Sequence, residues 1–405
     1  MITPIRIEAE HISDPASGVT VIRDWLSYEV ESDMFKASDA FTMRVAPTKE
    51  LREFFRLPGH IVRIFYGGHI QMTGVVDATP ITGGADGPQL EITGRDFGGL
   101  LDSDCAMMDF SKNTLMDIMT AQIAPWREWI PGIELDYTLH RWRICGKKAK
   151  KKSMGVYAPI TGERLFKTRS IIGDTVNALL SRLAPQIGCH SWFSADGHLI
   201  IARPNYAQEP LHKLYYHLDD MGGVSRSNCH LGRTPDIGDR YSDYNIVGQG
   251  YVNATQSGKA ISDHASATRD PSKSFWYGPL NRRLLKSSTR AVRNVQDKKL
   301  LLRHARTQME RKAIDTYGMV GEAPGHEMYE GGPLWSIDTM VDVDYQPKQI
   351  DAPHMVSRRK FIYDSQGPRT TFNLIPPIWL SVDHDKTPDS KYNDTMTKLF
   401  DRYAL

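Results

Sequence analysis

The segment closest to a catalytic motif is His326-Glu-Met-Tyr-Glu330. It begins like the H-E-x-x-H helix of zinc proteases, in which two histidines one turn apart bind the metal and the glutamate acts as a base. Here the fifth residue is Glu330, and the flanks are Ala323-Pro-Gly325 and Gly331-Gly-Pro333. Glycine and proline on both sides oppose the helix that two ligands on one face require. We therefore predict no metal site at this position.

The cysteines do not form a metal-binding pattern either. No two of them are spaced as C-x-x-C, and the histidines that directly follow two of them do not have a zinc-ligand spacing. The four are Cys105, Cys145, Cys189 and Cys229. Such sparse cysteine usage is typical of a chain that folds in a reducing cytoplasm.

Other residues that could do chemistry also lack a catalytic context. There is no G-x-S-x-G and no P-loop. Gly83-Gly-Ala-Asp-Gly-Pro88 lies between two expected strands, which favours a hairpin turn over a phosphate loop. Asp219-Asp220 is a carboxylate pair, but the sequence does not place such a pair across a cleft. The eight tryptophans are scattered along the chain and form no sugar-stacking platform. The sequence predicts no catalytic residues, no cofactor and no enzyme activity.

The densest charge run is Lys147 to Lys152, within Gly146-Lys-Lys-Ala-Lys-Lys-Lys-Ser153. It could contact phosphate or an acidic partner, but no aromatic residue interleaves the lysines as a stacking site requires. We interpret it as a solvated loop. The whole chain carries 50 Lys and Arg against 48 Asp and Glu, a net charge of +2 that does not favour nucleic acid or an anionic membrane as a general partner.

Length and hydropathy limit the class of protein further. The 405 residues suggest about three domains at ~150 residues each. The start, MITPIRIEAEHISDP, has no apolar signal region, and no run of ~18 apolar residues occurs. We expect no signal peptide, no membrane span and no membrane anchoring.

The elements that organise the chain are two β segments with matching spacing. Ile61 to Tyr66 alternates as a strand does, and Gly87-Pro88 and a second strand follow; Val341 to Tyr345 and Gly367-Pro368 repeat the arrangement. Twenty-one positions separate Tyr66 from Gly87 and 22 separate Tyr345 from Gly367. We interpret this as one β unit used twice in the chain.

Between and around the two copies the composition changes, and it predicts a mainly β fold with an α/β insertion. Two similar tube-like β-barrel domains are expected, together with a small α/β module and an inserted helix. The α/β module has a helix over 171–184 capped by Asp174 and a hairpin turning at Asp196-Gly197. The inserted part has a long polar loop and a basic helix from Thr289 to Tyr317, whose Lys and Arg residues are expected to face water. The predicted domains are 1–101 (first barrel), 102–205 (α/β module), 206–250 with 318–380 (second barrel), 251–317 (insertion) and 381–405 (tail).

The order of these pieces resembles the baseplate hub proteins of contractile-tailed bacteriophages, the Mu-type tail hub family. The resemblance rests on Thr93-Gly-Arg-Asp96, on the helix and hairpin from Gly173 to Leu199, on Arg240 to Gln249, and on Gly332-Pro-Leu-Trp-Ser-Ile337 before a Val-Asp-Val-Asp strand. It extends over residues 20 to 380. No long β-repeat follows Ile375, unlike in fused family members, so the spike is expected to be a separate chain.

The resemblance implies a homotrimer in the virion tail baseplate, assembled in the host cytoplasm. Two barrels per chain would give a ring of six like units that joins the sixfold tail tube to the threefold central spike. The implied partners are a second and third copy of the chain, the tail tube protein and the central spike protein, with tape-measure and baseplate wedge proteins as further candidates and DNA only in transit. A wet lumen requires polar strand faces, for which Arg63, Asp342 and Asp344 are the candidates. The alternatives are a tail-tip cell-wall hydrolase and a peripheral baseplate adaptor or receptor-binding protein.

Overall fold

The computed structural model describes most of the β-rich chain. The described residues are 5–12, 18–56, 59–84, 87–103, 105, 114–135, 173–187, 189–205, 208–236, 240–249, 264–269, 287–293 and 298–377. The predictions for the lysine run 147–152 and for the tail 381–405 lie outside these residues. No helix within the described ranges is long and apolar enough to cross a membrane.

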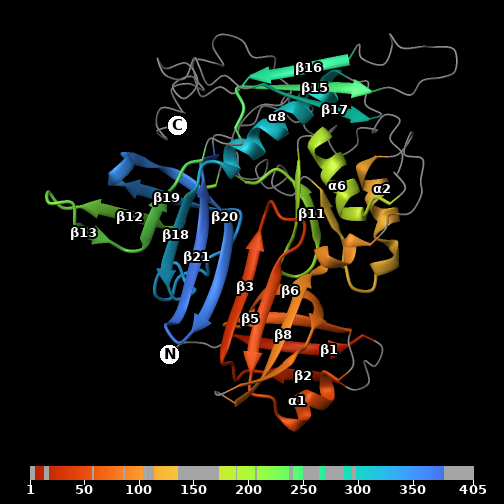
Figure 1. The fold of residues 1–405 in the computed structure, drawn as a ribbon, viewed down its shortest axis with the longest axis vertical. Coiled ribbons are helices and arrows are strands. Elements are labelled where there is room, and N and C mark those ends of the chain that lie inside the picture. The colour runs from red at the N-terminus through yellow and green to blue at the C-terminus, as the bar shows by residue number, and fades with distance from the viewer. Residues whose placement is uncertain are drawn as a thin grey trace.

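The first unit is an antiparallel sheet with one short helix (Figure 1). Its elements are β1 (Arg6–His11), β2 (Val19–Ile22), β3 (Ser27–Asp33), β4 (Ala40–Val45), α1 (Lys49–Phe54), β5 (His60–Tyr66), β6 (His69–Ala78), β7 (Ile81–Gly84) and β8 (Gly87–Asp96). Strand β4 shows the pattern that builds the core, since Phe41, Met43 and Val45 are buried and alternate with more exposed residues. Helix α1 was not predicted; it begins at Thr48, whose side chain accepts a hydrogen bond from Leu51 N.

The α/β module has its own core beside the first unit. Its elements are η2 (Phe97–Asp102), α2 (Leu115–Gln122), η3 (Ala124–Trp126), β9 (Ile133–Leu135), α6 (Val176–Leu183), η4 (Ala184–Ile187), β10 (His190–Phe193) and β11 (Leu199–Ala202), and the strand order is β10-β11-β9. The predicted helix and hairpin are present, but the N-cap of α6 is Thr175 and not Asp174. Asp174 instead forms an ion pair with Arg182 over 2.9 Å.

The second unit consists of strands from both sides of the insertion. They are β12 (Lys213–Leu218), β13 (Val224–Ser227), β14 (His230–Arg233), β18 (Met319–Pro324), β19 (Thr339–Tyr345), β20 (Ile350–Asp364) and β21 (Gly367–Ile375), with η7 (Gln346–Lys348) between β19 and β20. Trp335 fills the core of this unit, where it is fully buried and stacks on Phe372 with 4.3 Å between ring centroids.

The insertion differs from the prediction. Strand β15 (Asp243–Gln249), expected in the second unit, pairs with β16 (His264–Arg269) and β17 (Ser287–Arg293) in a separate sheet. Both partners lie where a loop and the start of a helix were predicted. β16 reads HASATR and β17 reads SSTRAVR, so neither has the large alternating apolar side chains that mark a strand. Helix α8 (Lys298–Asp315) begins nine residues after the predicted cap Thr289.

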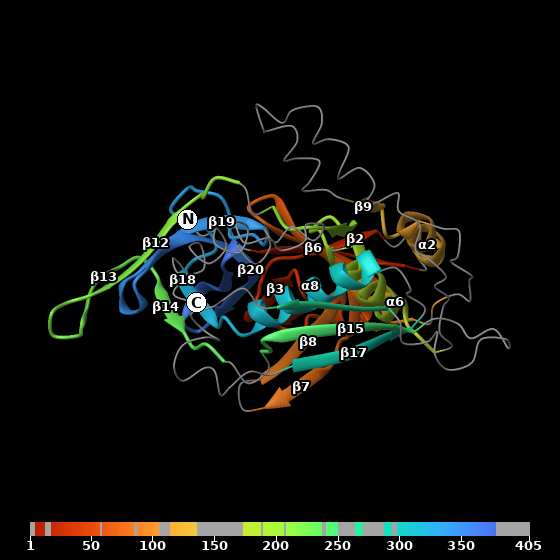
Figure 2. The same cartoon turned by 90° about the horizontal axis from the view of Figure 1, so that it is seen from above.

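Part of the polar face expected on α8 is buried, while Arg311 on the same helix is exposed. Arg306 is only 2% exposed, and Thr307 and Glu310 are buried as well, so the prediction of a water-facing basic surface is wrong at Arg306. The helix lies between the β15 sheet and the α/β module, and both cover it (Figures 1 and 2). Thr307 Oγ1 donates to Pro185 O over 3.3 Å, and an Arg311 guanidinium nitrogen donates to Phe35 O over 2.8 Å.

The two units share one order of strand pairing. In the first unit the pairs are β1·β2, β1·β5, β5·β6, β6·β8, β8·β4 and β4·β3; in the second they are β12·β13, β12·β19, β19·β20, β20·β21, β21·β18 and β18·β14. Taken in chain order, the strands of the two units correspond, and β6 and β7 together match the single long strand β20. One direction differs, since β1·β5 is antiparallel and β12·β19 is parallel. This shared pairing order agrees with the repeat inferred from the sequence.

The described pairings leave each unit open and join the two edge to edge. Strand β3 of the first unit pairs with the second half of β20, which produces one continuous 15-stranded sheet. No described pairing closes either unit into a separate barrel. The mainly β fold class is confirmed, with its α/β module and inserted helix.

Candidate assembly interface

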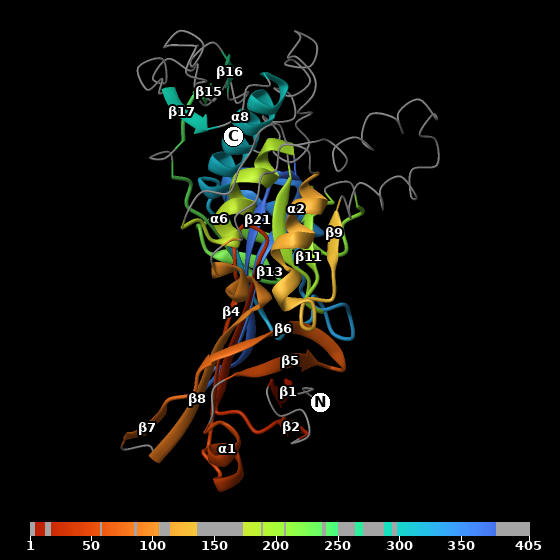
Figure 3. The same ribbon diagram turned by 90° about the vertical axis from the view of Figure 1, so that its right-hand side faces the viewer.

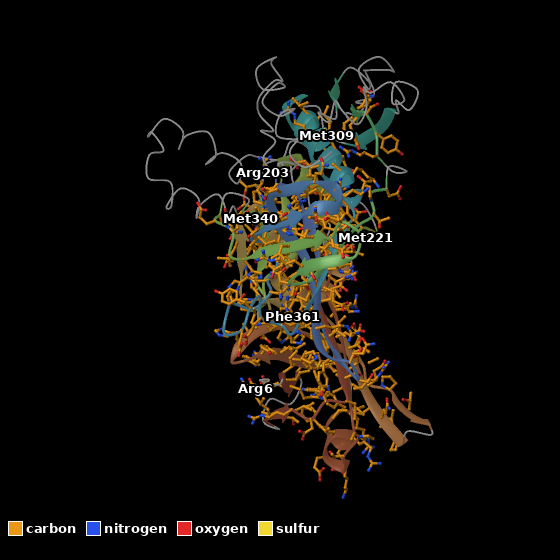
Figure 4. All side chains as sticks on the ribbon, turned by 90° about the vertical axis from the view of Figure 1, so that its left-hand side faces the viewer. Arg6, Arg203, Met221, Met309, Met340 and Phe361 are labelled. Carbon is orange, nitrogen blue, oxygen red and sulfur yellow. The ribbon has the colours of Figure 1, made fainter. Side chains whose placement is uncertain are left out.

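The junction between the two units is built by β3 and β20. Six residue pairs run from Arg358–Asp33 to Tyr363–Tyr28. Arg358 Nε lies 2.9 Å from a Glu31 carboxylate oxygen, and Lys360 pairs with Glu29. Burial disfavours the charged form of Glu31, but hydrogen bonds from Lys36 and Arg358 outweigh it and lower the pKa of Glu31. On the inner face, Phe361 is fully buried (Figure 4).

The histidine of the near-catalytic motif belongs to this junction. Tyr28 Oη lies 2.9 Å from His326 Nε2, and His326 Nδ1 lies 3.0 Å from Thr370 Oγ1. The His326 ring stacks on Phe361 with 4.3 Å between centroids. Burial lowers the pKa of His326 to about 4, so the ring is neutral at pH 7. With both nitrogens in hydrogen bonds, His326 holds the two units together and has no nitrogen left to bind a metal.

A polar cavity of about 310 Å³ lies where the two units meet the α/β module, and the lining residues come from all three. Arg359 is buried beside it, and its guanidinium donates to Gln71 O over 3.1 Å. Two further nitrogens of Arg359, Nε and Nη1, have no hydrogen-bond partner among the described residues. Burial lowers the pKa of Arg359 to about 10, while Asp39 acts in the opposite direction. Asp39 and Asp96 also line this cavity.

The buried carboxyl group of Asp96 makes the free energy of unfolding depend on pH. Burial raises the pKa of Asp96 to about 7. The folded protein therefore keeps a proton that an unfolded Asp, with a pKa near 3.9, releases, and stability falls as pH rises from about 4 to 7, on the order of 1 kcal/mol per pH unit. We predict that Asp96→Asn flattens this dependence in urea unfolding between pH 4.5 and 7.5. Asparagine keeps the Oδ1 acceptor for Gly98 N, which lies 2.9 Å from the Asp96 oxygen.

The control for this experiment is Asp220→Asn, on the exposed turn between β12 and β13. It should leave the slope of stability against pH as in the wild type. An equal slope for Asp96→Asn and the wild type would contradict the assignment.

The three predicted lumen residues lie on partly exposed strand faces. The Arg63 side chain on β5 is 43% exposed, with a guanidinium nitrogen 3.8 Å from Glu10. Asp344 on β19 lies 3.4 Å from Lys213 Nζ and 3.0 Å from His217 Nε2. Asp342 lies on the same strand and is half-buried. The structure does not bring Arg63 together with the two aspartates, because they belong to different units.

Two projecting hairpins were not predicted as interface elements. The β7–β8 hairpin extends away from the body (Figures 2 and 3), and Ile81 on it is 53% exposed. The β12–β13 hairpin extends from the second unit and carries Met221, which is 94% exposed (Figure 4). Asp219 fixes its turn by accepting hydrogen bonds from Met221 N and Gly223 N. The sequence signals were the glycines at these turns, which mark hairpins but not what lies against them.

The fold is similar to that of two solved tail proteins. A tail protein from Neisseria meningitidis MC58 has a TM-score of 0.69 at 21% identity, and the match covers 93% of this chain and 98% of that one. The 43 kDa tail protein of prophage MuSo2 from Shewanella oneidensis has a TM-score of 0.65 at 17% identity, covering 92% of this chain and 98% of the other. At these identities the likeness concerns the fold. No curated protein matches the sequence.

The first unit is similar to a known family domain. Residues 17–96 match the family model of the N-terminal domain of the Mu phage baseplate assembly protein GpP-like group. This match confirms the resemblance to Mu-type baseplate proteins over residues 17–96.

Proposed function

We propose that the chain is the structural hub of a contractile-tail baseplate, as a homotrimer in which six like units form a ring. The observation that carries the proposal is the shared pairing order of the two units. A threefold assembly of a chain with two like units has six quasi-equivalent positions, so it can meet a sixfold tube on one side and a threefold spike on the other. The family match of residues 17–96 supports a baseplate location.

The chain acts in this proposal by assembly and not by catalysis. Its partners are two further copies of itself, the tail tube protein and a separate spike protein, with DNA passing through the lumen. Tape-measure and baseplate wedge proteins are further proposed partners. Arg63, Asp342 and Asp344 are proposed to face the lumen. Because Arg63 and Asp342 occupy matched positions with opposite charge, the lumen would have threefold and not sixfold charge symmetry.

Mass measurement in solution, combined with images of the tail, tests this function. We expect a species of about 137 kDa, three times the chain mass of 45.8 kDa, located on the tail axis. A chain found at the baseplate rim would support the adaptor alternative. Clearing of peptidoglycan in a zymogram would support the hydrolase alternative.

A further inference from the structure

We propose that strand β7 of one copy pairs with strand β14 of the next copy, antiparallel, in the register that β20 and β3 have inside the chain. The proposal rests on the proposed trimer and identifies the strands that close it. Its basis is the internal repeat, because a contact that links two like units inside a chain should recur between chains in a closed ring of such units.

The first step is that β7 is the counterpart of the second half of β20. Each forms the first strand of a hairpin, and the second strand of that hairpin begins at Gly87 in one unit and at Gly367 in the other. These two glycines lie 280 positions apart. Each residue pair in one hairpin has its equivalent 280 positions away in the other. The pairs are Ile81–Leu90 and Phe361–Thr370, Thr82–Gln89 and Ile362–Arg369, Gly83–Pro88 and Tyr363–Pro368, and Gly84–Gly87 and Asp364–Gly367.

The second step is that β14 is the counterpart of β3. Phe41 on β4 lies opposite Gly94, and Met319 on β18 lies opposite Leu374. Gly94 and Leu374 are also 280 positions apart, so Phe41 and Met319 occupy equivalent positions in β4 and β18. This alignment fixes that of β3 and β14. The equivalent pairs are Ser27–Arg44 and His230–Glu322, Tyr28–Met43 and Leu231–Gly321, Glu29–Thr42 and Gly232–Val320, and Val30–Phe41 and Arg233–Met319.

The register between chains follows from these two alignments. Inside the chain, β20 and β3 pair as Phe361–Val30, Ile362–Glu29 and Tyr363–Tyr28. When this register is applied between copies, Ile81 of one copy lies opposite Arg233 of the next. Thr82 then lies opposite Gly232, and Gly83 lies opposite Leu231. Both strands are four residues long, so the pairing uses their full lengths.

Burial supports a covered position for β7. Phe361 is fully buried in the second unit because β3 and the rest of the junction cover it, whereas its counterpart Ile81 is 53% exposed in the single chain. Across the described ranges, β7 pairs only with β8 and β14 only with β18. Strand edges with exposed apolar side chains are the usual sites for addition of a further strand.

Two grooves at equivalent positions support the same contact. The first, of about 450 Å³, is lined by Trp25, Leu26 and Ala46, and Tyr363 at the end of β20 supplies part of its wall. The second, of about 620 Å³, is lined by their counterparts Asn228, Cys229 and Pro324. The counterpart of Tyr363 is Gly83 on β7. In the proposed pairing, Gly83 of the neighbouring copy completes the second groove.

A second copy of this chain is the occupant that these observations favour. The strand that fits β14 is found in the chain itself, in the register that the internal junction already uses. A contact between β14 of one copy and β7 of the next is heterologous, and it closes after three copies if the rotation per chain is 120°. A four-residue ladder sets register, while the wider face around it supplies most of the buried area that an obligate interface requires.

Cysteine cross-linking tests the register directly. Thr82→Cys and Gly232→Cys would lie opposite each other, at the Cα separation of roughly 4.5–5.5 Å that a disulfide accepts. A Cβ at Gly232 would meet only Val320 Cγ2 at 3.8 Å, an ordinary contact. We expect the double variant to form covalent dimers and trimers on non-reducing gels, and the two single variants, co-expressed, to form covalent dimers only. Each single variant alone measures the background from the native cysteines.

The matched control moves one cysteine by one residue. Gly83→Cys with Gly232→Cys places the two thiols on opposite faces of the ladder, and position 83 has open space for a side chain. Equal cross-linking by both pairs, or none by either while the wild type has the trimer mass, would overturn the proposed pairing and leave the hub function standing. A wild-type chain that is monomeric by mass would overturn both.

Discussion

Replacing Phe361 with alanine should lower the free energy of unfolding by about 3–5 kcal/mol, the usual cost of removing a buried phenyl ring. The effect should be this large because Phe361 is fully buried and packs at 4.3 Å on the neutral His326 ring that links the two units. Arg359 also lies over the Phe361 ring, with its guanidinium carbon 4.0 Å from the ring centroid. Urea unfolding at one fixed protein concentration measures the loss.

The matched control is Ile81→Ala, at the equivalent position of the first unit. Ile81 is 53% exposed, so its replacement should change the unfolding free energy of the single chain by less than about 0.5 kcal/mol. It should nevertheless shift the monomer–trimer equilibrium toward monomer, since Ile81 is covered in the proposed ring. Similar losses of chain stability for the two variants would contradict the assignment of β7 as an open counterpart of β20.

The second large effect is expected at Gly321, where β18 passes the Phe372 ring. A Cβ at this position would lie 2.1 Å from a Phe372 ring carbon, and that ring is buried between Gly321 and Trp335. We expect Gly321→Val to cost about 3 kcal/mol in the free energy of unfolding, because the ring has no room to move. The midpoint of urea unfolding reports it.

A second-site change separates overcrowding from a general weakness of the strand. Phe372→Leu makes space, so the double variant Gly321→Val with Phe372→Leu should be more stable than the sum of the two single losses predicts. Gly232→Val is the control on the neighbouring strand, where a Cβ meets nothing closer than 3.8 Å. Strict additivity of the two changes would show that the Phe372 ring is not what excludes a side chain at 321.

The parts of the fold that the sequence predicts are those that depend on large apolar residues at regular spacing. Tyr66 and Gly87 mark the end of β5 and the start of β8, and Tyr345 and Gly367 mark the end of β19 and the start of β21. The alternation along β5 and β19 identifies which residues are buried. The helix α6 and the Asp196-Gly197 hairpin follow from equally local signals. In each case the side chains that carry the pattern also form the core.

The rest could not be read from one sequence, because it depends on contacts between distant segments. β16 and β17 are held by pairing to β15 and lack an apolar pattern of their own. Arg306 is polar, yet it is buried because the insertion and the α/β module enclose α8 from two sides. The neighbours of His326 in the chain resemble a metal-binding motif, but its hydrogen-bond partners Tyr28 and Thr370 are 298 and 44 residues away.

In the proposed ring, the contact that joins the two units within a chain has its equivalent between chains. Inside the chain, β3 covers the second half of β20 with paired charges and a buried phenyl ring. In the first unit, the same half-strand is the separate strand β7, with Ile81 exposed. The repeat leaves β7 of the first unit and β14 of the second unit as open strand edges, so one copy of the chain can pair with the next. The rotation between neighbouring copies then determines whether the assembly closes into a ring.

Electron cryo-microscopy of the isolated tail end, at a resolution that separates strands, tests the central claim most directly. We predict three copies of this chain around the tail axis as a ring of six similar β units, with continuous sheet density across every junction. A ring in which the two units of one chain occupy unlike positions, or density for this chain away from the axis, would contradict it.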